Sequence, residues 1–341
     1  MRNRYADTIK GIIILLVILG HSIQYGNGQY YLHNGLFFNN SVFKFIYSFH
    51  MPIFMLISGY YMGISINRHT TFELIYNKIC HLLVPVAAFG LLTEGSITKL
   101  LYTINGGMNI YDFGVEYIYL IYMNYHLWFL WSVFFNSIIV IFVSKWFDNP
   151  LIYLFIGFFM LFIPNHKLLG VYSFMYPYFI IGYYAYRTNF LNKITITKEK
   201  SFTLGILFLI CIVFYNKDSY VYTSGQCILN GIYYLLLDIY RFVTGLIGSA
   251  FVLCFIYLFY QHFNFSYVFQ KLGKNSMELY CFQDLIISWF LIYILPLIPN
   301  SNDFNIFTTF LSFLLIVSFS IISTAITKKH KYLNFLLFAK N

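Results

Sequence analysis

Lys10 and His21 are the residues of this chain whose types and spacing are best suited to chemistry. They flank an apolar run from Ile12 to Leu19 and are eleven positions apart. In an α-helix this spacing returns both side chains to nearly the same face, about 16 Å apart along the axis. A lysine can bind an anionic group, and an imidazole can transfer a proton near neutral pH. The simpler alternatives are a packing histidine and a snorkelling lysine, with Asp7 as its ion-pair partner.

Other polar side chains are predicted to lie at the depth of that histidine, within hydrophobic helices. Glu94 has no local partner, and His126 and Trp128 open another apolar segment. Asp238 and Arg241 are spaced i, i+3 and are expected to neutralise each other. Because a charged group in a membrane costs a few kcal/mol on insertion scales, each of these residues is a functional candidate until a structural partner accounts for it.

The composition argues against a water-soluble fold. Of the 341 residues 60% are hydrophobic and only 10% are charged, whereas soluble proteins carry roughly a quarter charged residues. The formal charge of +9 could suggest a nucleic-acid partner, but the basic residues are spread over many short joints, so no nucleic acid is expected. No Cys or His spacing typical of a metal site occurs, and no metal is predicted.

Hydrophobic run lengths predict an all-α, polytopic transmembrane helical bundle of about ten helices, since a bilayer requires roughly 20 apolar residues per span. One domain over 1–341 is expected. The predicted spans are 8–25, 42–64, 80–101, 126–144, 150–164, 170–187, 202–216, 236–260, 277–297 and 304–326. If the N-terminus is cytoplasmic, only five basic residues lie on the external side of the membrane in the ten-span arrangement: Lys44, Lys99, Lys167, Lys217 and Arg241. This bias follows the positive-inside rule and predicts that both termini are cytoplasmic.

The opening MRNRYADTIKGIIILLVILGH resembles the acyltransferase 3 family of membrane O-acyltransferases, especially its fucose 4-O-acetylase-like branch. That family begins with a basic residue, ten intervening residues and a His, which here are Lys10 and His21, with Lys in place of the usual Arg. Similar segments follow in order: FHMPIFMLISGYYMG at 49–63, HLLVPVAAF at 81–89, HLWFLWSVF at 126–134, YPYFIIGYYAYR at 176–187 and LGKNSMELYCFQ at 272–283.

Several positions in these segments qualify the resemblance. Lys78 and His81 stand where the family often has a second basic pair, and Gln283 stands where it often has a His, so no catalytic role is assigned to Gln283. Ser58 and Gly59 lie in ISGYY without a nucleophile elbow around them. Small residues there are predicted to permit close helix packing.

The resemblance implies transfer of an acyl group, usually acetyl from cytoplasmic acetyl-CoA, to a sugar hydroxyl of a capsule, an O-antigen or another surface glycan. The CoA phosphates are expected at the inner basic set of Lys10, Arg68, Lys78 and His81. His21 is expected to act as general base or, alternatively, in an acyl-His relay. Glu94 is expected to orient His21, with His126 or Trp128 contacting the sugar.

The chain is also expected to be a multi-pass protein of the inner (cytoplasmic) membrane, in contact with membrane lipid. A homo-oligomer is compatible with this expectation. Two other functions stay open. A transporter or flippase for a glycan or lipid-linked precursor would show helices broken at mid-membrane or an internal duplication. A glycan polymerase would show a large charged external loop.

Overall fold

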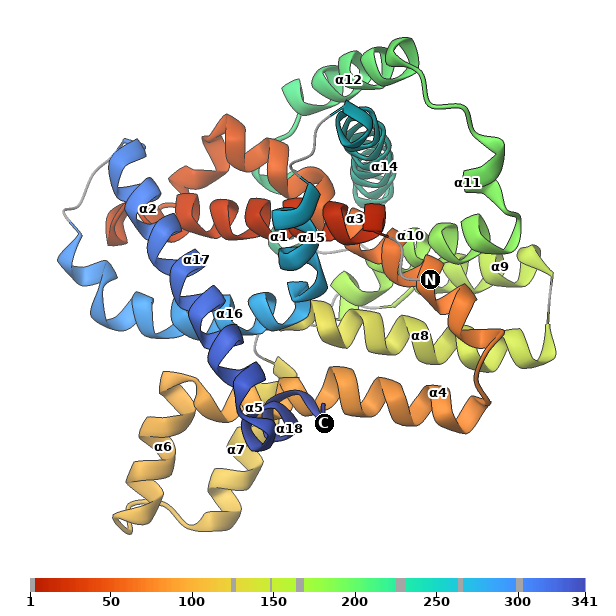
Figure 1. Cartoon of the computed structure of the whole chain (residues 1–341). Helices are drawn as coiled ribbons and strands as arrows, with labels where there is room; N and C mark the ends of the chain where they lie inside the picture. Colours follow the sequence, from red (N-terminus) through yellow and green to blue (C-terminus); the bar gives the residue numbers. More distant parts are fainter. Residues whose placement is uncertain are drawn as a thin grey trace. The chain divides into compact units, whose positions relative to one another are not determined.

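The computed structural model describes residues 4–123, 127–147, 149–163, 169–224, 231–262, 266–298 and 303–340. Throughout these ranges the chain forms helices joined by turns and contains no β-strand, which confirms the predicted all-α fold (Figure 1). Contacts divide the chain into two compact units. Unit 1 is Met1–Gly20, Phe38–Ile75 and Ser132–Lys274, and unit 2 is His21–Phe37, Tyr76–Trp131 and Asn275–Asn341. One domain over 1–341 stays a prediction.

Helices α1 (Arg4–Tyr25), α4 (Thr71–Lys78) and α8 (Trp128–Trp146) contribute residues to both units. The other helices of unit 1 are α3 (Ser41–Ile66), α9 (Pro150–Met160), α10 (Leu169–Arg187), α11 (Phe190–Lys193), α12 (Lys198–Val213), α13 (Val221–Ser224), α14 (Ile232–His262) and α15 (Ser266–Lys274). The other helices of unit 2 are α2 (Gln29–His33), α5 (Val84–Leu92), α6 (Glu94–Ile104), α7 (Ile110–Met123), α16 (Ser276–Tyr293), α17 (Ile306–Lys329) and α18 (Lys331–Phe338).

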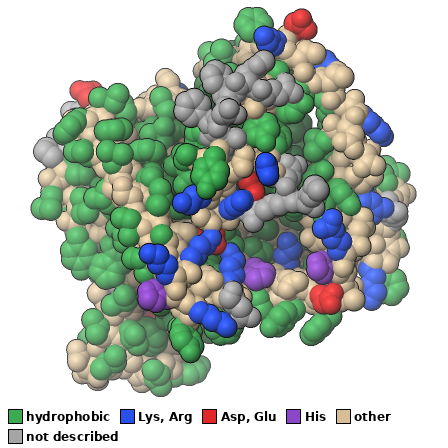
Figure 2. All heavy atoms as spheres, viewed as in Figure 1, with side chains coloured by type: hydrophobic (Ala, Val, Ile, Leu, Met, Phe, Trp, Pro, Cys, Tyr) green, Lys and Arg blue, Asp and Glu red, His purple; other side chains and the backbone are tan. Residues whose placement is uncertain are grey.

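Within the described ranges, six helical segments are long and apolar enough to cross a membrane. They are Arg4–Tyr25, Ser41–Ile66, Thr71–Leu92, Trp128–Trp146, Ile232–Tyr260 and Ile306–Lys329. This is the composition of a multi-pass membrane protein, and hydrophobic side chains cover much of the face shown in Figure 2. Helices α9, α10, α12 and α16 lie at four further predicted spans, and the total of about ten spans stays a prediction.

Close packing of α3 on α10 depends on glycine. A Cβ atom at Gly59 of α3 would lie 1.9 Å from the carbonyl oxygen of Phe179, and one at Gly182 of α10 would lie 2.0 Å from that of Leu56. No side chain fits between backbones at these distances. Of the pair Ser58 and Gly59, the structure thus confirms close helix packing for Gly59.

Helices α1 and α15 also touch through their backbones. A Cβ atom at Gly11 would lie 1.9 Å from the carbonyl oxygen of Phe269, and one at Gly273 would lie 1.7 Å from that of Asp7. The short α15 is therefore held directly against the N-terminal half of α1.

The predicted third span, 80–101, is not one helix. A π-helical turn (Ile79–Leu83) joins α4 to α5, which ends at Leu92. Thr93 is then extended (φ −63°, ψ 150°), and α6 starts at Glu94. The Thr93 hydroxyl lies 2.9 Å from the Gly90 carbonyl oxygen and 3.2 Å from the Ser96 hydroxyl, and such local bonds stabilise a helix break. The membrane-length segment instead begins earlier, at Thr71, and ends at Leu92.

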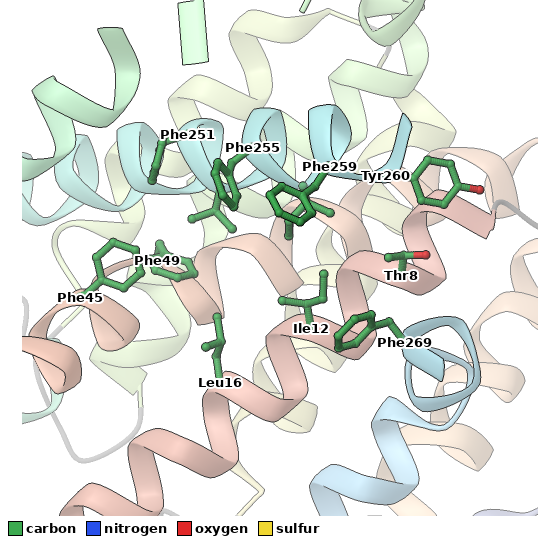
Figure 3. Close-up of a pocket in the computed structure, with 12 residues that line it drawn as sticks. Thr8, Ile12, Leu16, Phe45, Phe49, Phe251, Phe255, Phe259, Tyr260 and Phe269 are labelled. Atoms are coloured by element: carbon green, nitrogen blue, oxygen red, sulfur yellow. The ribbon is translucent and has the colours of Figure 1, made fainter. Parts of the chain in front are cut away.

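An apolar groove of about 450 Å³ lies in unit 1 beside the core (Figure 3). It is called the aromatic groove below. Helices α1, α3, α14 and α15 form it, and its walls include Ile12, Leu16, Phe45, Phe251, Phe255 and Phe269. The buried core next to it consists of Ile9, Ile13, Phe49, Ile53, Phe208, Val252 and Ile256.

In unit 2 the start of α16 is joined to the last helix. Glu278, which is 2% exposed, lies 2.7 Å from Lys340 Nζ and 3.6 Å from Lys328 Nζ. Asn275 occupies the N-cap of α16 but makes no side-chain capping bond, and it accepts a hydrogen bond from Lys328 instead. Phe338 of α18 is fully buried. The end of the chain is thus fixed to the LGKNSMELYCFQ segment.

Candidate functional site

Lys10 lies on α1 in unit 1, paired with its neighbour. Its Nζ is 2.9 Å from Oδ1 of Asp7, which confirms Asp7 as the ion-pair partner. The Asp7 side chain is 1% exposed, whereas that of Lys10 is 20% exposed. The same Nζ lies 5.5 Å from the centre of the Tyr61 ring, a cation–π contact. Two neighbours therefore hold the ammonium in place, and any bound phosphate would share it with the Asp7 carboxylate.

His21 lies on the same continuous helix, in the part that belongs to unit 2. Its ring stacks on that of Tyr25, one turn further along, with 5.8 Å between centroids and 13° between planes. Asp284 of α16 lies within electrostatic reach of the Tyr25 hydroxyl. Unit 2 therefore groups an imidazole, a phenol and a carboxylate, and these three residues are called the His21 cluster.

Gln283 precedes the carboxylate of this cluster in sequence. Its side chain is 1% exposed, and its Oε1 has no hydrogen-bond partner within the part of the chain that the structure describes. Buried polar atoms are nearly always hydrogen-bonded, so an amide oxygen with spare capacity can accept a bond from a ligand hydroxyl. No catalytic role was predicted for this residue from the sequence.

The predicted phosphate-binding residues are divided equally between the units. Lys10 belongs to unit 1, as does Arg68, which is exposed just after α3. Lys78, the half-buried last residue of α4, and His81, exposed in the π-helical turn, belong to unit 2. Neither unit alone contains the set. Across the described ranges no group of three or more His, Cys, Asp or Glu side chains could hold a metal ion.

The structure describes only some of the remaining predicted site residues. Glu94 is the first residue of α6, but its side chain lies outside the described residues, as does the whole of His126. Trp128 begins α8, is half-buried, and meets Phe129 edge-on at 6.1 Å. The roles of Glu94, His126 and Trp128 therefore stay predictions.

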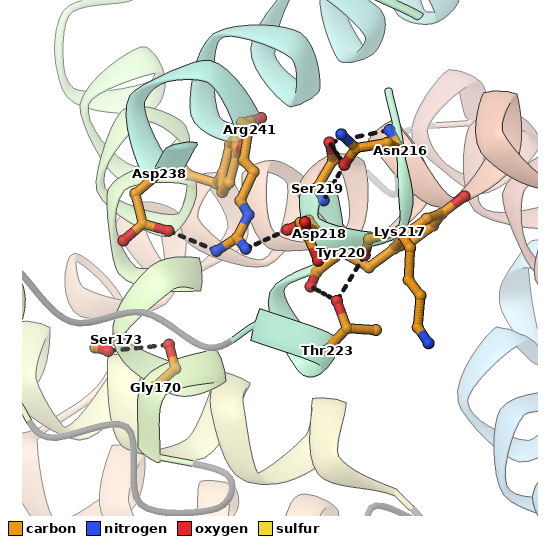
Figure 4. Close-up of polar contacts among 11 residues, drawn as sticks. Gly170, Ser173, Asn216, Lys217, Asp218, Ser219, Tyr220, Thr223, Asp238 and Arg241 are labelled. Atoms are coloured by element: carbon orange, nitrogen blue, oxygen red, sulfur yellow. Dashed lines mark hydrogen bonds and ion pairs between the residues drawn. The ribbon is translucent and has the colours of Figure 1, made fainter. Parts of the chain in front are cut away.

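Asp238 and Arg241 neutralise each other, as their spacing predicted (Figure 4). The Arg241 Nη1 atom is 2.7 Å from Oδ1 of Asp238, and Nη2 donates to the Asp218 carbonyl oxygen at 2.6 Å. Both side chains are buried, at 3% and 6% exposed. Tyr220 lies in the same 216–220 segment as Asp218. Burial raises the pKa of the Tyr220 hydroxyl, and the nearby Tyr215 raises it further. The pair thus anchors the 216–220 joint to α14.

His50 of α3 is a buried histidine that was not among the residues predicted from the sequence. Its ring is 3% exposed and its Nδ1 lies 2.7 Å from the Ile46 carbonyl oxygen. A carbonyl oxygen can only accept, so Nδ1 carries the proton and Nε2 is the basic nitrogen of the neutral ring. His50 also meets Tyr47 edge-on at 4.7 Å, and Tyr47 fills the space beside Gly20 of α1. The only sequence feature that could have indicated His50 was its position in the FHMP segment at 49–52.

Comparison with known proteins adds an independent observation. Residues 3–328 match the acyltransferase 3 family, described as an acyltransferase domain. The chain is 27% identical over 230 residues to the nodulation protein NolL of Sinorhizobium fredii (strain NBRC 101917 / NGR234), which covers 64% of this chain and 59% of that protein. It is also 28% identical over 230 residues to NolL of Mesorhizobium japonicum (strain LMG 29417 / CECT 9101 / MAFF 303099). That match covers 65% of this chain and 59% of that protein.

The chain spans only 59% of the length of either NolL protein. No solved structure matches it. The family match, in contrast, covers almost the whole chain and includes the helix that carries Lys10 and His21. This chain belongs to the acyltransferase 3 family.

Proposed function

We propose that this chain is a membrane O-acyltransferase, which moves an acyl group, in the simplest case acetyl, from cytoplasmic acetyl-CoA to a hydroxyl of a cell-envelope or exported carbohydrate. The observation that carries the proposal is the family match over residues 3–328. It is supported by α1, where a lysine and a histidine stand eleven positions apart on one continuous helix. We also propose that the protein lies in the inner membrane with both termini in the cytoplasm; the distribution of basic residues supports this orientation.

The donor is proposed to bind at the basic side. Acetyl-CoA carries several phosphate charges, which Lys10, Arg68, Lys78 and His81 would attract. The axial distance from Lys10 to His21 is about 16 Å. An extended pantetheine arm could bridge it, so the nucleotide would stay at the inner face while the thioester reaches deeper.

His21 is proposed to act as general base in direct transfer. The neutral imidazole takes the proton of the acceptor hydroxyl while that oxygen attacks the thioester carbonyl carbon. A C–O bond forms, the C–S bond breaks, and the proton passes to the departing sulfur, which gives the free CoA thiol. In the alternative relay the imidazole itself first accepts the acyl group.

A carboxylate is proposed to orient the base. Glu94 was predicted for this role. Asp284 is a second candidate, because it lies near the Tyr25 hydroxyl and Tyr25 stacks on His21. On the acceptor side, Trp128 and His126 are proposed to contact the sugar, and the Oε1 atom of Gln283 could accept a hydrogen bond from one of its hydroxyls.

The proposal is tested on the native glycan. Envelope polysaccharide from a strain lacking the gene is compared by NMR and mass spectrometry with that from strains complemented with wild type, His21→Ala or His33→Ala. His33, exposed at the end of α2 in the same unit, is the matched control. We expect acyl content to disappear on deletion and to return with wild type and His33→Ala only. Unchanged acylation after deletion would refute the enzyme assignment, and full restoration by His21→Ala would refute the mechanism.

A further inference from the structure

We infer that the aromatic groove of unit 1 binds one fatty acyl chain of an anionic phospholipid, taken from the leaflet next to the N-terminal end of α1. The lipid is a resident ligand and takes no part in acyl transfer. The inference is independent of the proposed function, because it concerns the opposite face of α1.

Helical geometry separates the groove from the polar face. Relative to Lys10, the side chain of His21 is rotated by only about 20° around α1, at 100° per residue. Ile12 and Leu16, which line the groove, are rotated by roughly 200° and 240°. The groove therefore lies behind the helix as seen from Lys10 and His21, and its occupant is distinct from a donor or acceptor bound at that face.

The walls of the groove are suited to a hydrocarbon chain. Phe251, Phe255 and Phe259 project from successive turns of α14, with ring centroids 5.9 Å and 5.3 Å apart (Figure 3). The Thr8 hydroxyl at the edge of the groove donates a hydrogen bond to the Arg4 carbonyl oxygen at 3.0 Å, so its proton is already used within α1. Phe255 and Phe259 are 48% and 50% exposed, and the groove is therefore open on its outer side. Its volume, about 450 Å³, is that of a small-molecule site.

A cluster of tyrosines lies at one end of the groove, where Tyr260 is one of the lining residues (Figure 3). Tyr5 of α1 meets Tyr257 and Tyr260 of α14 at 5.6 Å each, and its hydroxyl donates to the Leu253 carbonyl oxygen at 2.6 Å. Tyrosines gather where a membrane meets water. The groove thus begins just below the interface and runs into the hydrocarbon of one leaflet, which is the position of a lipid tail.

Positive charge surrounds the same end. Arg4 is exposed at the start of α1, and α15 carries exposed Lys271 and Lys274 just after Phe269, which lines the groove. A basic rim at the interface attracts anionic headgroups. Charge complementarity therefore favours an anionic phospholipid over a zwitterionic one.

The test is native mass spectrometry of the full-length protein, purified in mild detergent and exchanged into bilayers of phosphatidylglycerol or phosphatidylcholine. We expect the wild type to retain one phosphatidylglycerol. Leu16→Trp, which fills the groove, should lose it, whereas Leu207→Trp, on the exposed apolar face of α12, should keep it. Lys271→Gln should weaken retention about fivefold, since one surface cation contributes about a factor of that size.

Size-exclusion profiles of the variants show whether each remains folded. Retention of phosphatidylcholine as strongly as phosphatidylglycerol would overturn the inference, as would a co-purifying polyprenyl-linked glycan in place of a phospholipid. Equal lipid retention by folded Leu16→Trp and wild type would overturn it as well.

Discussion

The Nζ atom of Lys10 lies 2.9 Å from Oδ1 of Asp7, and this carboxylate is almost completely buried. The pair explains how a charged lysine is held at the start of a hydrophobic helix. It also means that the net charge offered at this turn is close to zero. Under the proposed function, a donor phosphate that binds there would have to weaken an existing contact, so other cations would be needed to hold acetyl-CoA.

Removing the lysine alone should destabilise the protein. Lys10→Ala removes the ammonium that lies 2.9 Å from the buried Asp7 carboxylate, and breaking a buried ion pair in this way costs about 3 kcal/mol. The double variant Lys10→Ala/Asp7→Asn should recover most of this loss. Thermal unfolding of the protein in detergent measures both. Equal stability of the single variant and wild type would contradict the importance of the pair.

His21→Ala should reduce acyl transfer by about 10²- to 10⁴-fold, which is the usual contribution of a general base. Tyr25→Phe keeps the stacked ring and removes only its hydroxyl, so its effect on rate should be much smaller. Transfer is measured as release of free CoA thiol by the purified enzyme with acetyl-CoA and acceptor glycan. A rate in His21→Ala equal to that in Tyr25→Phe would argue against the base assignment.

Asp284→Asn separates the two candidate carboxylates. If Asp284 orients His21, this variant should lower the rate and shift its pH dependence, whereas Glu94→Gln should leave both near wild type. The opposite result would assign the role to Glu94. The measurement is the pH profile of acyl transfer for the two variants, and a packing defect alone would not move the profile.

Gly59→Ala should separate α3 from α10, because the added Cβ atom would lie 1.9 Å from a backbone oxygen. Overpacking of this kind destabilises by roughly 1–3 kcal/mol. Gly114→Ala in α7 is the control, because nothing lies within 4 Å of a Cβ atom there. That substitution should be neutral or stabilise by about 0.5–1 kcal/mol, as alanine favours the helix. Similar thermal stabilities for the two variants would contradict the packing argument.

Glu278→Gln should loosen the end of the chain, because the buried carboxylate holds Lys340 at 2.7 Å and lies 3.6 Å from Lys328. Limited proteolysis should then cut the α18 segment faster than in wild type. Glu199→Gln, on the exposed first turn of α12, provides the comparison. Identical cleavage of α18 in wild type and Glu278→Gln would show that Phe338 packing alone is sufficient.

The sequence was most informative where interactions are local. The ion pairs Lys10–Asp7 and Arg241–Asp238 are spaced i, i+3, so helical geometry alone predicted them. The bond from Lys340 to Glu278 joins residues 62 positions apart, and no spacing rule predicts it. The proximity of Asp284 to Tyr25 likewise relates two helices, α16 and α1, that are far apart in the sequence, and no spacing rule predicts it.

The break at Thr93 was missed for a different reason. Apolar residues stand on both sides of Thr93, so a window of span length extends across it, while the helix ends through hydrogen bonds of one hydroxyl. Thr93, followed by Glu94 and Gly95, is a cap-like sequence that could have indicated the boundary. Hydropathy finds membrane segments, but it does not find where a helix inside one stops.

The contact between Gly11 and Gly273 has a mechanical consequence. With the backbones of α1 and α15 touching, the two helices cannot slide past each other without breaking this contact. Helix α15 carries Phe269 on one side of the contact, and the turn of α1 on the other carries Asp7 and Lys10. Any displacement of the short helix, by a lipid or by a mutation, would therefore be transmitted directly to the charged turn.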